Sequence, residues 1–161
     1  MRRKEREVID YAEIEEIIRE CRVCRLGFSA GMYPYIVPMN FGYENVNGRR
    51  ILFFHCAGEG RKLDLLRRNP DVAFEMDCRH RLMSPENKVD ACGYSYYYAS
   101  VMGTGRASFL FEPSEKEAAL LAIMRHMTAK KTFLITKNSL RSVTVFQVEI
   151  NSLSCKKHGS F

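Results

Sequence analysis

One stretch of the chain decides its fold and its chemistry: Phe53-Phe54-His55-Cys56-Ala57-Gly58-Glu59-Gly60-Arg61-Lys62-Leu63-Asp64. Its apolar beginning predicts a buried strand over residues 50–56. The two glycines predict a loop, and a short helix is expected over residues 61–68. Asn69-Pro70 ends that helix, because proline cannot continue the helical hydrogen-bond ladder.

The helix start has an unusual charge. The first turn of a helix has unpaired N–H groups and partial positive charge, so acidic side chains are normally favoured there. Arg61 and Lys62 have the opposite sign. Together with the backbone N–H groups and the glycine loop they are typical of a phosphate site. Two solvated cations are the plain alternative, because the unfavourable dipole interaction is only ~0.3–1 kcal/mol.

The glycine spacing excludes two nucleotide-binding loops. It matches neither G-x-x-x-x-G-K-[ST] nor G-x-G-x-x-G, so the sequence does not support kinase-like or Rossmann chemistry.

Hairpin signals dominate the chain before this stretch. A helix is expected over residues 10–20, with Asp10 and Glu13 as a capping box and an apolar stripe of Ile14, Ile17 and Ile18. Strands follow over residues 23–28 and 32–43. Pro34 and Pro38 predict that the second of these is bent or half-exposed at a sheet edge. The Asn-Gly turn within residues 45–48 predicts a hairpin into residues 50–56.

The second half of the chain continues the pattern. Strands are expected over residues 72–76, 97–111 and 142–150, with a helix over residues 113–127. Gly103 and Gly105 predict a bulge in the long strand. Residues 79–91 are polar and contain Pro85, which indicates a loop or a short hairpin. Six or seven strands and three helices without regular alternation favour an antiparallel barrel with helices outside over a doubly wound parallel sheet.

Composition limits the class of protein. With 161 residues, 46% hydrophobic and 27% charged, the chain is expected to form a single globular domain. The net charge of +6 indicates an anionic partner without naming it. No apolar run is long enough for a membrane helix, and no signal peptide is visible, so we expect a cytoplasmic protein without a membrane partner. The six cysteines should then be mostly reduced thiols.

Several motifs together resemble one known family. The chain resembles the FMN-binding split-barrel family related to pyridoxamine 5′-phosphate oxidase, and within it the branch of nitroimidazole-resistance proteins. The matching pieces are Val-Pro-Met-Asn-Phe-Gly-Tyr (37–43), Phe-His-Cys-Ala (54–57), Gly-Arg-Lys-Leu-Asp (60–64), Asn-Pro (69–70), Tyr-Ala-Ser-Val-Met-Gly (98–103), Gly-Arg-Ala (105–107) and Met-Arg-His (124–126).

The resemblance implies a fold and an assembly. The fold is a mainly β, six-stranded antiparallel split β-barrel with flanking helices, spanning residues 1–161 as one FMN-binding domain. The assembly is a homodimer with FMN at the interface.

The resemblance also implies a set of site residues. Arg61 and Lys62 would hold the ribityl phosphate, in agreement with the local pattern. His55 would be the catalytic or functionally important side chain. The other expected cofactor contacts are Cys56 and Ala57 along the flavin, backbone groups of Asn40, Phe41 and Gly42 at the isoalloxazine ring, and Ser100 and Val101 near the phosphate or ring.

Two departures from the family pattern concern the substrate side. Tyr94 stands where a Trp is expected, and Ala99 stands where a charged residue is common. The tyrosine-rich run over residues 94–98 could cover a flavin or substrate, or pack across the dimer. It could also stack on nucleic acid, but the cations are spread along the chain and no nucleic-acid recognition motif is present.

Other candidate groups have plainer interpretations. His126 is expected to be structural. Cys21-x-x-Cys24 has redox or metal spacing, but no second ligand pair follows it and it does not open a helix, so we predict no metal site. Cys92 is interpreted as a buried thiol.

The sequence therefore predicts an FMN-dependent oxidoreductase of a small flat or nitroaromatic substrate. The alternative is a non-catalytic protein of the same fold that binds flavin or haem, with His55 or His126 as axial ligand.

Overall fold

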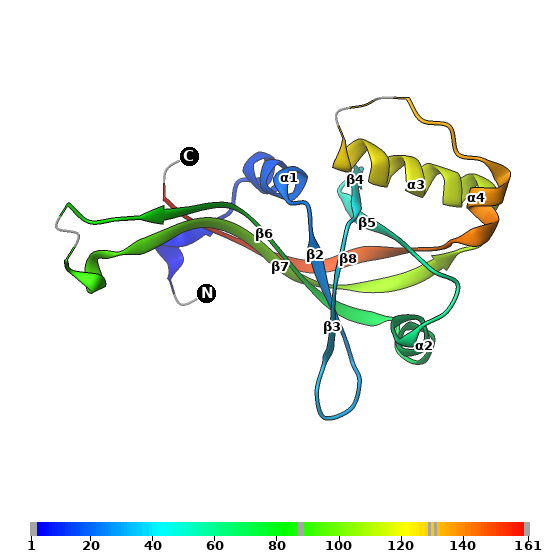
Figure 1. Ribbon diagram of the computed structural model, residues 1–161, viewed down its shortest axis with the longest axis horizontal. Coiled ribbons are helices and arrows are strands. Elements are labelled where there is room, and N and C mark those ends of the chain that lie inside the picture. The colour runs from blue at the N-terminus through cyan, green and yellow to red at the C-terminus, as the bar shows by residue number, and fades with distance from the viewer. Residues whose placement is uncertain (1–2, 87–88, 129, 131, 160–161) are drawn as a thin grey trace.

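The computed structural model describes residues 3–86, 89–128, 130 and 132–159. These residues form eight antiparallel strands in the order β3-β2-β6-β7-β8-β5-β4, with β1 beside β8 (Figure 1). The strands are β1 (Glu7–Val8), β2 (Cys24–Phe28), β3 (Tyr35–Met39), β4 (Gly42–Val46), β5 (Arg49–Cys56), β6 (Asp71–Met83), β7 (Ser95–Leu110) and β8 (Thr144–His158). The α-helices are α1 (Tyr11–Glu20), α2 (Arg61–Arg68), α3 (Pro113–Met127) and α4 (Lys137–Ser142), with 3₁₀ turns at Lys4–Arg6 and Ala91–Gly93.

The predicted fold class is confirmed: the protein is a mainly β split barrel with helices outside the sheet. The described residues form more than six strands, because the expected strand over residues 32–43 divides into β3 and β4, and the two-residue β1 adds to the sheet. Helix α4 is an addition to the elements that the sequence predicts. None of the helices in the described part of the chain has both the length and the apolar character needed to cross a membrane.

Three local predictions are confirmed: a proline on an edge strand, a tight hairpin turn and a bulge in the long strand β7. β3 lies at an edge of the sheet beside β2, and this edge tolerates Pro38, which has no N–H to donate. The β4–β5 hairpin turns at Asn47 (φ 53°) and Gly48 (φ 86°), the left-handed pair that a tight hairpin requires. The predicted bulge is present, because the β7–β8 register shifts between Thr104 and Gly105.

The sequence predicts a loop or a short hairpin over residues 79–91, and the structure has a hairpin whose paired strands are longer than expected. β6 continues to Met83, which pairs with Ser95 of β7, so the two strands form a long arm that projects from the body (Figure 1). The register shifts between Cys78 and Arg81 on this arm. The sequence shows no clear alternation there, because many side chains of the arm are exposed on both faces.

An N-cap and an ion pair hold the N-terminal end of helix α1. Asp10 Oδ1 accepts hydrogen bonds from the N–H groups of Ala12 (2.7 Å) and Glu13 (3.4 Å), which confirms the N-cap. The Glu13 carboxylate forms an ion pair with Lys157 of β8. This ion pair replaces the return hydrogen bond to the Asp10 N–H that the predicted capping box would have. The predicted stripe of Ile14, Ile17 and Ile18 is buried in the barrel core.

Strand β5 separates two hydrophobic cores. Leu52 and Phe54 face the barrel interior, where Phe54 stacks on Phe146 at 5.2 Å. Phe53 faces the other way and packs with Val145 under α3. The residues of α3 that complete this second core are Ala119, Ala122 and Ile123.

His126 connects the end of α3 to the end of α1. Its Nε2 lies 2.8 Å from the Cys21 carbonyl oxygen, so Nε2 carries the proton and donates. The ring centroid lies 4.3 Å from that of Phe41, and Arg22 donates to the His126 carbonyl. Burial lowers the pKa of His126, while the hydrogen bond to Cys21 opposes this shift. This geometry supports the structural interpretation of His126.

Replacing Gly42 by Ala tests the close approach of α3 to β4. A Cβ at this position would lie 2.5 Å from the Ile123 nitrogen and 2.7 Å from the Ala122 carbonyl carbon, and backbone cannot rotate away. We expect Gly42→Ala to lower the free energy of unfolding by about 1–3 kcal/mol, measured by chemical denaturation. Gly58→Ala is the matched control, because no atom lies within 4 Å of the place that its methyl group would take. Equal stability of the two variants would contradict the close approach.

The depressed pKa of His126 predicts a stability slope. Between its folded pKa and the ordinary value of 6.5, the unfolded chain binds a proton that the folded chain does not, so stability falls as the pH is lowered through this window. His126→Asn should flatten the slope measured by denaturation from pH 7 to pH 5. Above pH 7 the two proteins should keep a constant difference, since His126 is neutral in both states. An unchanged slope of unfolding free energy against pH in the variant would contradict the prediction.

Candidate functional site

The β5–loop–α2 segment forms as the sequence predicts. β5 ends at Cys56, and Ala57 lies exposed in the loop that follows. Gly60 has φ 134°, a left-handed conformation that favours glycine, and it has no side chain to cap the helix. The N–H groups of Leu63 (2.9 Å) and Asp64 (3.3 Å) bond to the Gly60 carbonyl. The earlier N–H groups of the first turn therefore face outward without a capping side chain.

The two cations of this first turn lie on different sides of it. The Arg61 guanidinium stacks over the Tyr35 ring of β3, 4.6 Å from its centroid. Lys62 lies near Cys56: burial raises the pKa of that thiol, and the Lys62 charge opposes the shift. Among the described residues neither Arg61 nor Lys62 has a carboxylate within 4 Å, and Asp64 is paired with Arg67 instead (3.0 Å). The positive charge at the start of α2 is thus uncompensated.

A cavity of about 660 Å³ lies beside this helix. It separates α2 from the loop that follows β2, and Arg61 and Arg68 bring two guanidinium groups to it. The full lining is Ser29, Ala30, Gly31, Arg61, Asp64, Leu65, Arg68 and Asn69. A ligand held at the start of α2 could extend along this space.

His55 and Cys56 point to opposite faces of β5, as neighbours on a strand must. Cys56 packs against the barrel core. His55 is exposed and lines an apolar pocket of about 280 Å³ under the end of α3. Its other lining residues in the described chain carry no ionisable group: Leu120, Ile123, Met124, Phe133, Leu134, Ile135, Ser139 and Val143. Among these described residues, His55 therefore carries the one ionisable side chain.

The corner between β3 and β4 offers backbone rather than side chains. Asn40 Nδ2 donates to the Arg22 carbonyl at 3.0 Å. The Phe41 side chain is buried between His126 and Phe54, with the Phe54 centroid 6.5 Å away. Gly42 is covered by α3. The side chains of Phe41 and Gly42 therefore offer nothing to a ligand, and the contact that the resemblance implies for these residues, through their main-chain groups, stays a prediction.

Ser100 and Val101 are not brought to α2 within one chain. Val101 is fully buried in the barrel core, and Ser100 is half-buried on β7. On the same strand, Ala107 donates to the carbonyl of Pro70, just after α2. Seven residues separate this point from Ser100, or roughly 20 Å at ~3.3 Å per residue. These two predicted contacts therefore lie apart from the cations of α2.

Sequence reasoning missed two parts of this region. Tyr35, which holds the Arg61 guanidinium, is only one aromatic residue among several in its part of the sequence. The apolar run over residues 133–135 lines the His55 pocket, and its Leu134 is 90% exposed. The available signal was a run of three apolar residues in an otherwise polar connection. Such a run is typical of a segment that covers a pocket or contacts a partner.

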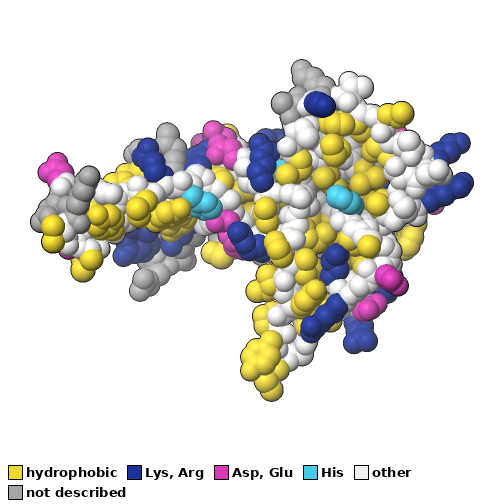
Figure 2. All heavy atoms as spheres, viewed as in Figure 1, with side chains coloured by type: hydrophobic (Ala, Val, Ile, Leu, Met, Phe, Trp, Pro, Cys, Tyr) yellow, Lys and Arg dark blue, Asp and Glu magenta, His cyan; other side chains and the backbone are white. Residues whose placement is uncertain are grey.

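The tyrosine-rich run lies on the β6–β7 arm. Tyr97 meets His158 edge-on at 5.7 Å, and Arg81 lies over the Tyr97 ring at 4.8 Å. Tyr96 remains half-exposed. Figure 2 shows hydrophobic side chains gathered along this arm and at the tip of the hairpin between β2 and β3. The exposed residues of these two regions include Leu82 (61%) on the arm, and Met32 (87%) and Tyr33 (75%) at the tip.

The cysteine pair of the Cys-x-x-Cys motif lies in the core. Cys21 and Cys24 are both fully buried, and burial raises the pKa of Cys24. Cys21 is in contact with Cys78, which lies near the end of α1 and 3.8 Å from the Ile17 carbonyl oxygen. Across the described residues, no group of three or more metal-binding side chains converges. Cys92, interpreted from the sequence as a buried thiol, is instead exposed. It lies in the 3₁₀ turn Ala91–Gly93, between β6 and β7.

Comparison with solved structures supports the fold. A candidate 5-nitroimidazole antibiotic resistance protein from Bacteroides thetaiotaomicron is 34% identical, with a TM-score of 0.79, covering 94% of this chain and 86% of that chain. Two other similar structures share the fold at lower identity. The flavocytochrome Anf3 from Azotobacter vinelandii has a TM-score of 0.79 at 18% identity, covering 99% of this chain and 72% of its own. An FAD- and haem-binding protein from Mycobacterium smegmatis has 0.75 at 14%, covering 97% and 75%.

Sequence comparison identifies the family. No curated protein matches the chain. The family described as pyridoxamine 5′-phosphate oxidase matches residues 10–157, which is nearly the whole chain. This match includes β5, the glycine loop and α2, and it confirms the resemblance drawn from the motifs. The chain belongs to the pyridoxamine 5′-phosphate oxidase family.

Proposed function

We propose that this protein is an FMN-dependent oxidoreductase that acts on a small flat or nitroaromatic substrate as a homodimer. The observation that carries the proposal is the uncompensated pair Arg61 and Lys62 at an uncapped helix start after a glycine loop. The family of the chain and the 34% identical candidate nitroimidazole-resistance protein support the same conclusion.

The charge at α2 favours FMN over a flavin without a terminal phosphate monoester. A phosphate monoester carries about 1.5–2 negative charges at neutral pH, which the two cations can balance. The outward N–H groups of the first turn can donate to its oxygens. Stacking on Tyr35 holds the Arg61 guanidinium, so less side-chain freedom is lost on binding.

The proposed role of His55 is to act on the substrate. A bound flavin would supply the electron transfer, and the chain would supply binding and orientation. The apolar pocket at His55 suits a flat ring with few polar groups. The imidazole can donate a proton to such a substrate or hold its polar substituent in place.

A second copy of the chain would complete the site. Of the two predicted flavin contacts on β7, Ser100 is half-buried and lies apart from α2 in one chain, while Val101 is buried in the barrel core. The exposed apolar side chains of the arm and of the β2–β3 hairpin offer surface for association (Figure 2). We therefore propose that the partner supplies the contacts that one chain does not bring together.

The second candidate is a non-catalytic protein that binds flavin or haem. Structures of the same fold that bind haem favour it. His55 is exposed and could serve as an axial ligand, whereas His126 already uses Nε2 on the Cys21 carbonyl. Reduction of a nitroimidazole by the flavin-loaded protein with a reduced nicotinamide would argue for the enzyme.

The spectrum of freshly purified protein is the first test. We expect a yellow protein whose heat-released cofactor is FMN by mass spectrometry. A Soret band without flavin absorbance would favour the haem-binding candidate. A colourless protein that takes up neither FMN nor haem would refute both proposals.

The cations of α2 are tested with a charge-matched pair of variants. Arg61→Ala/Lys62→Ala should weaken FMN binding at least about 100-fold, since each of the two charge-assisted hydrogen bonds contributes about 1.5–3 kcal/mol. Binding is measured by quenching of flavin fluorescence. Arg49→Ala/Arg106→Ala removes the same charge from exposed arginines that pair with Glu149 and Asp71, and should keep the wild-type affinity. Similar losses in both variants would show that only net charge matters.

A further inference from the structure

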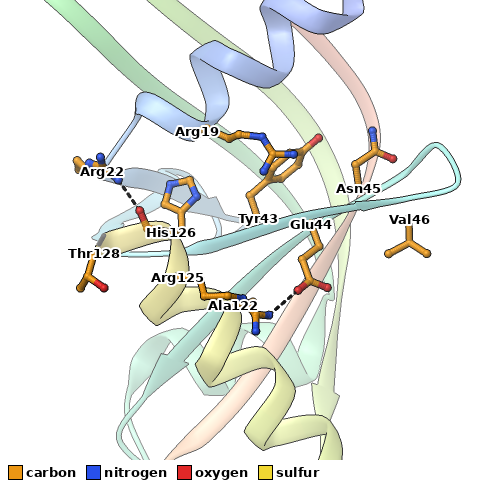
Figure 3. A pocket seen from close by; sticks show the side chains of 10 residues that line it. All are labelled: Arg19, Arg22, Tyr43, Glu44, Asn45, Val46, Ala122, Arg125, His126 and Thr128. Carbon is orange, nitrogen blue, oxygen red and sulfur yellow. Dashed lines mark hydrogen bonds and ion pairs between the residues drawn. The ribbon is translucent and has the colours of Figure 1, made fainter. Parts of the chain in front are cut away.

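A second cavity, of about 580 Å³, lies on the far side of α3 from His55. It is bounded by the C-terminal ends of α1 and α3 and by β4 (Figure 3). Its lining residues are Arg19, Arg22, Tyr43, Glu44, Asn45, Val46, Ala122, Arg125, His126 and Thr128.

Helix geometry separates this cavity from the pocket of the proposed function. Ala122, Arg125 and His126 share one face of α3, spaced as i, i+3 and i+4. The residues of α3 at His55 have the same spacing but lie two positions earlier, from Leu120 to Met124. One helix thus forms a wall of both spaces.

The charges around the cavity do not balance. Arg125 pairs with Glu44 at 3.0 Å (Figure 3). Arg19 (3.5 Å) and Arg50 (2.9 Å) share the single carboxylate of Glu15. The lining therefore holds three guanidinium groups, those of Arg19, Arg22 and Arg125, and one carboxylate, that of Glu44. Glu15, which Arg19 shares with Arg50, lies outside the lining.

Arg22 has no carboxylate of its own in the described chain. Its guanidinium donates to the His126 carbonyl, which is neutral. Glu20, which experiences the charge of Arg22, is hydrogen-bonded to Arg79 at 2.6 and 2.8 Å. Arg79 also pairs with Glu16 at 3.2 Å, so this neighbouring group has two carboxylates for one guanidinium, and Glu20 offsets part of the charge of Arg22. An excess of positive charge still remains beside the cavity.

The neutral polar groups of the lining are already engaged. The Tyr43 hydroxyl (2.7 Å) and Asn45 Nδ2 (2.9 Å) both donate to Glu15, and the Thr128 hydroxyl donates to the Met124 carbonyl (2.9 Å). A guanidinium has five N–H donors, and Arg22 and Arg125 each commit one nitrogen to the contacts named above. The free donors of the cavity are therefore mainly guanidinium N–H groups.

We propose that this cavity binds a phosphate monoester dianion. Its negative charge complements the positive excess, and its three terminal oxygens can accept from arginines on separate elements at once, whereas a carboxylate has two oxygens. The site is separate from α2, so it does not depend on FMN occupying the proposed flavin site.

The test measures binding of inorganic phosphate to FMN-saturated protein by isothermal titration calorimetry. FMN saturation keeps the start of α2 occupied. Arg22→Gln/Arg125→Gln should weaken phosphate binding at least about tenfold. Arg49→Gln/Arg106→Gln removes the same charge from exposed, carboxylate-paired arginines and should bind like the wild type.

Further variants separate folding and flavin effects from the cavity. Arg22 supports the end of α3, so Arg19→Gln/Arg125→Gln, which keeps that contact, should also weaken phosphate binding while the denaturation midpoint stays near the wild type. Arg61→Ala/Lys62→Ala should lose FMN affinity but keep phosphate binding at the cavity.

Three results would overturn the proposal. The first is absence of phosphate binding to the wild type at millimolar concentration. The second is equal affinity in the wild type and in both cavity variants. The third is tighter binding of malonate than of phosphate, which would assign the cavity to dicarboxylates. Failure of FMN binding alone would affect only the proposed function.

Discussion

The structure depends on the burial of β5 on both faces. Its even-numbered residues from Leu52 pack in the barrel, and its odd-numbered residues from Ile51 pack under α3. A shift of one residue would exchange the two faces, so the register is strongly specified. The same alternation carries past the buried part of the strand. It directs the His55 side chain to the apolar pocket and the Cys56 side chain to the barrel core. The chain leaves the sheet directly after these two residues and begins α2 at Arg61.

Helix α3 is the second organising element. It approaches β4 so closely that only glycine fits at position 42. His126 and Arg22 then connect its end to the end of α1. Since one face of the helix lines the His55 pocket and another lines the arginine-rich cavity, displacement of α3 would change both spaces together. The contacts that stabilise the fold are therefore also those that shape its binding spaces.

Unbalanced positive charge marks both proposed anion sites, but by different means. At α2 the cations are adjacent in sequence, and an uncapped helix start adds its own donors. At the cavity the excess arises because Arg22 has no carboxylate of its own among the described residues and Arg19 shares Glu15 with Arg50. Burial opposes ionisation of Glu15, but hydrogen bonds from Tyr43, Asn45 and Arg50 hold its pKa below the ordinary value. That carboxylate is therefore already committed, and a ligand would meet the remaining charge.

The sequence by itself determined the local elements and the positive charge at the start of α2. Helix caps, the Asn-Gly turn and proline placement act over a few residues, so α1, the β4–β5 hairpin, α2 and α3 could be predicted closely. Tertiary structure alone decided the arm, because its many exposed side chains leave no apolar period to detect. It also decided the separation of Ser100 from α2 and the meeting of Arg22 with Arg125. Such contacts between residues distant in sequence depend on how the sheet curls, which no local pattern encodes.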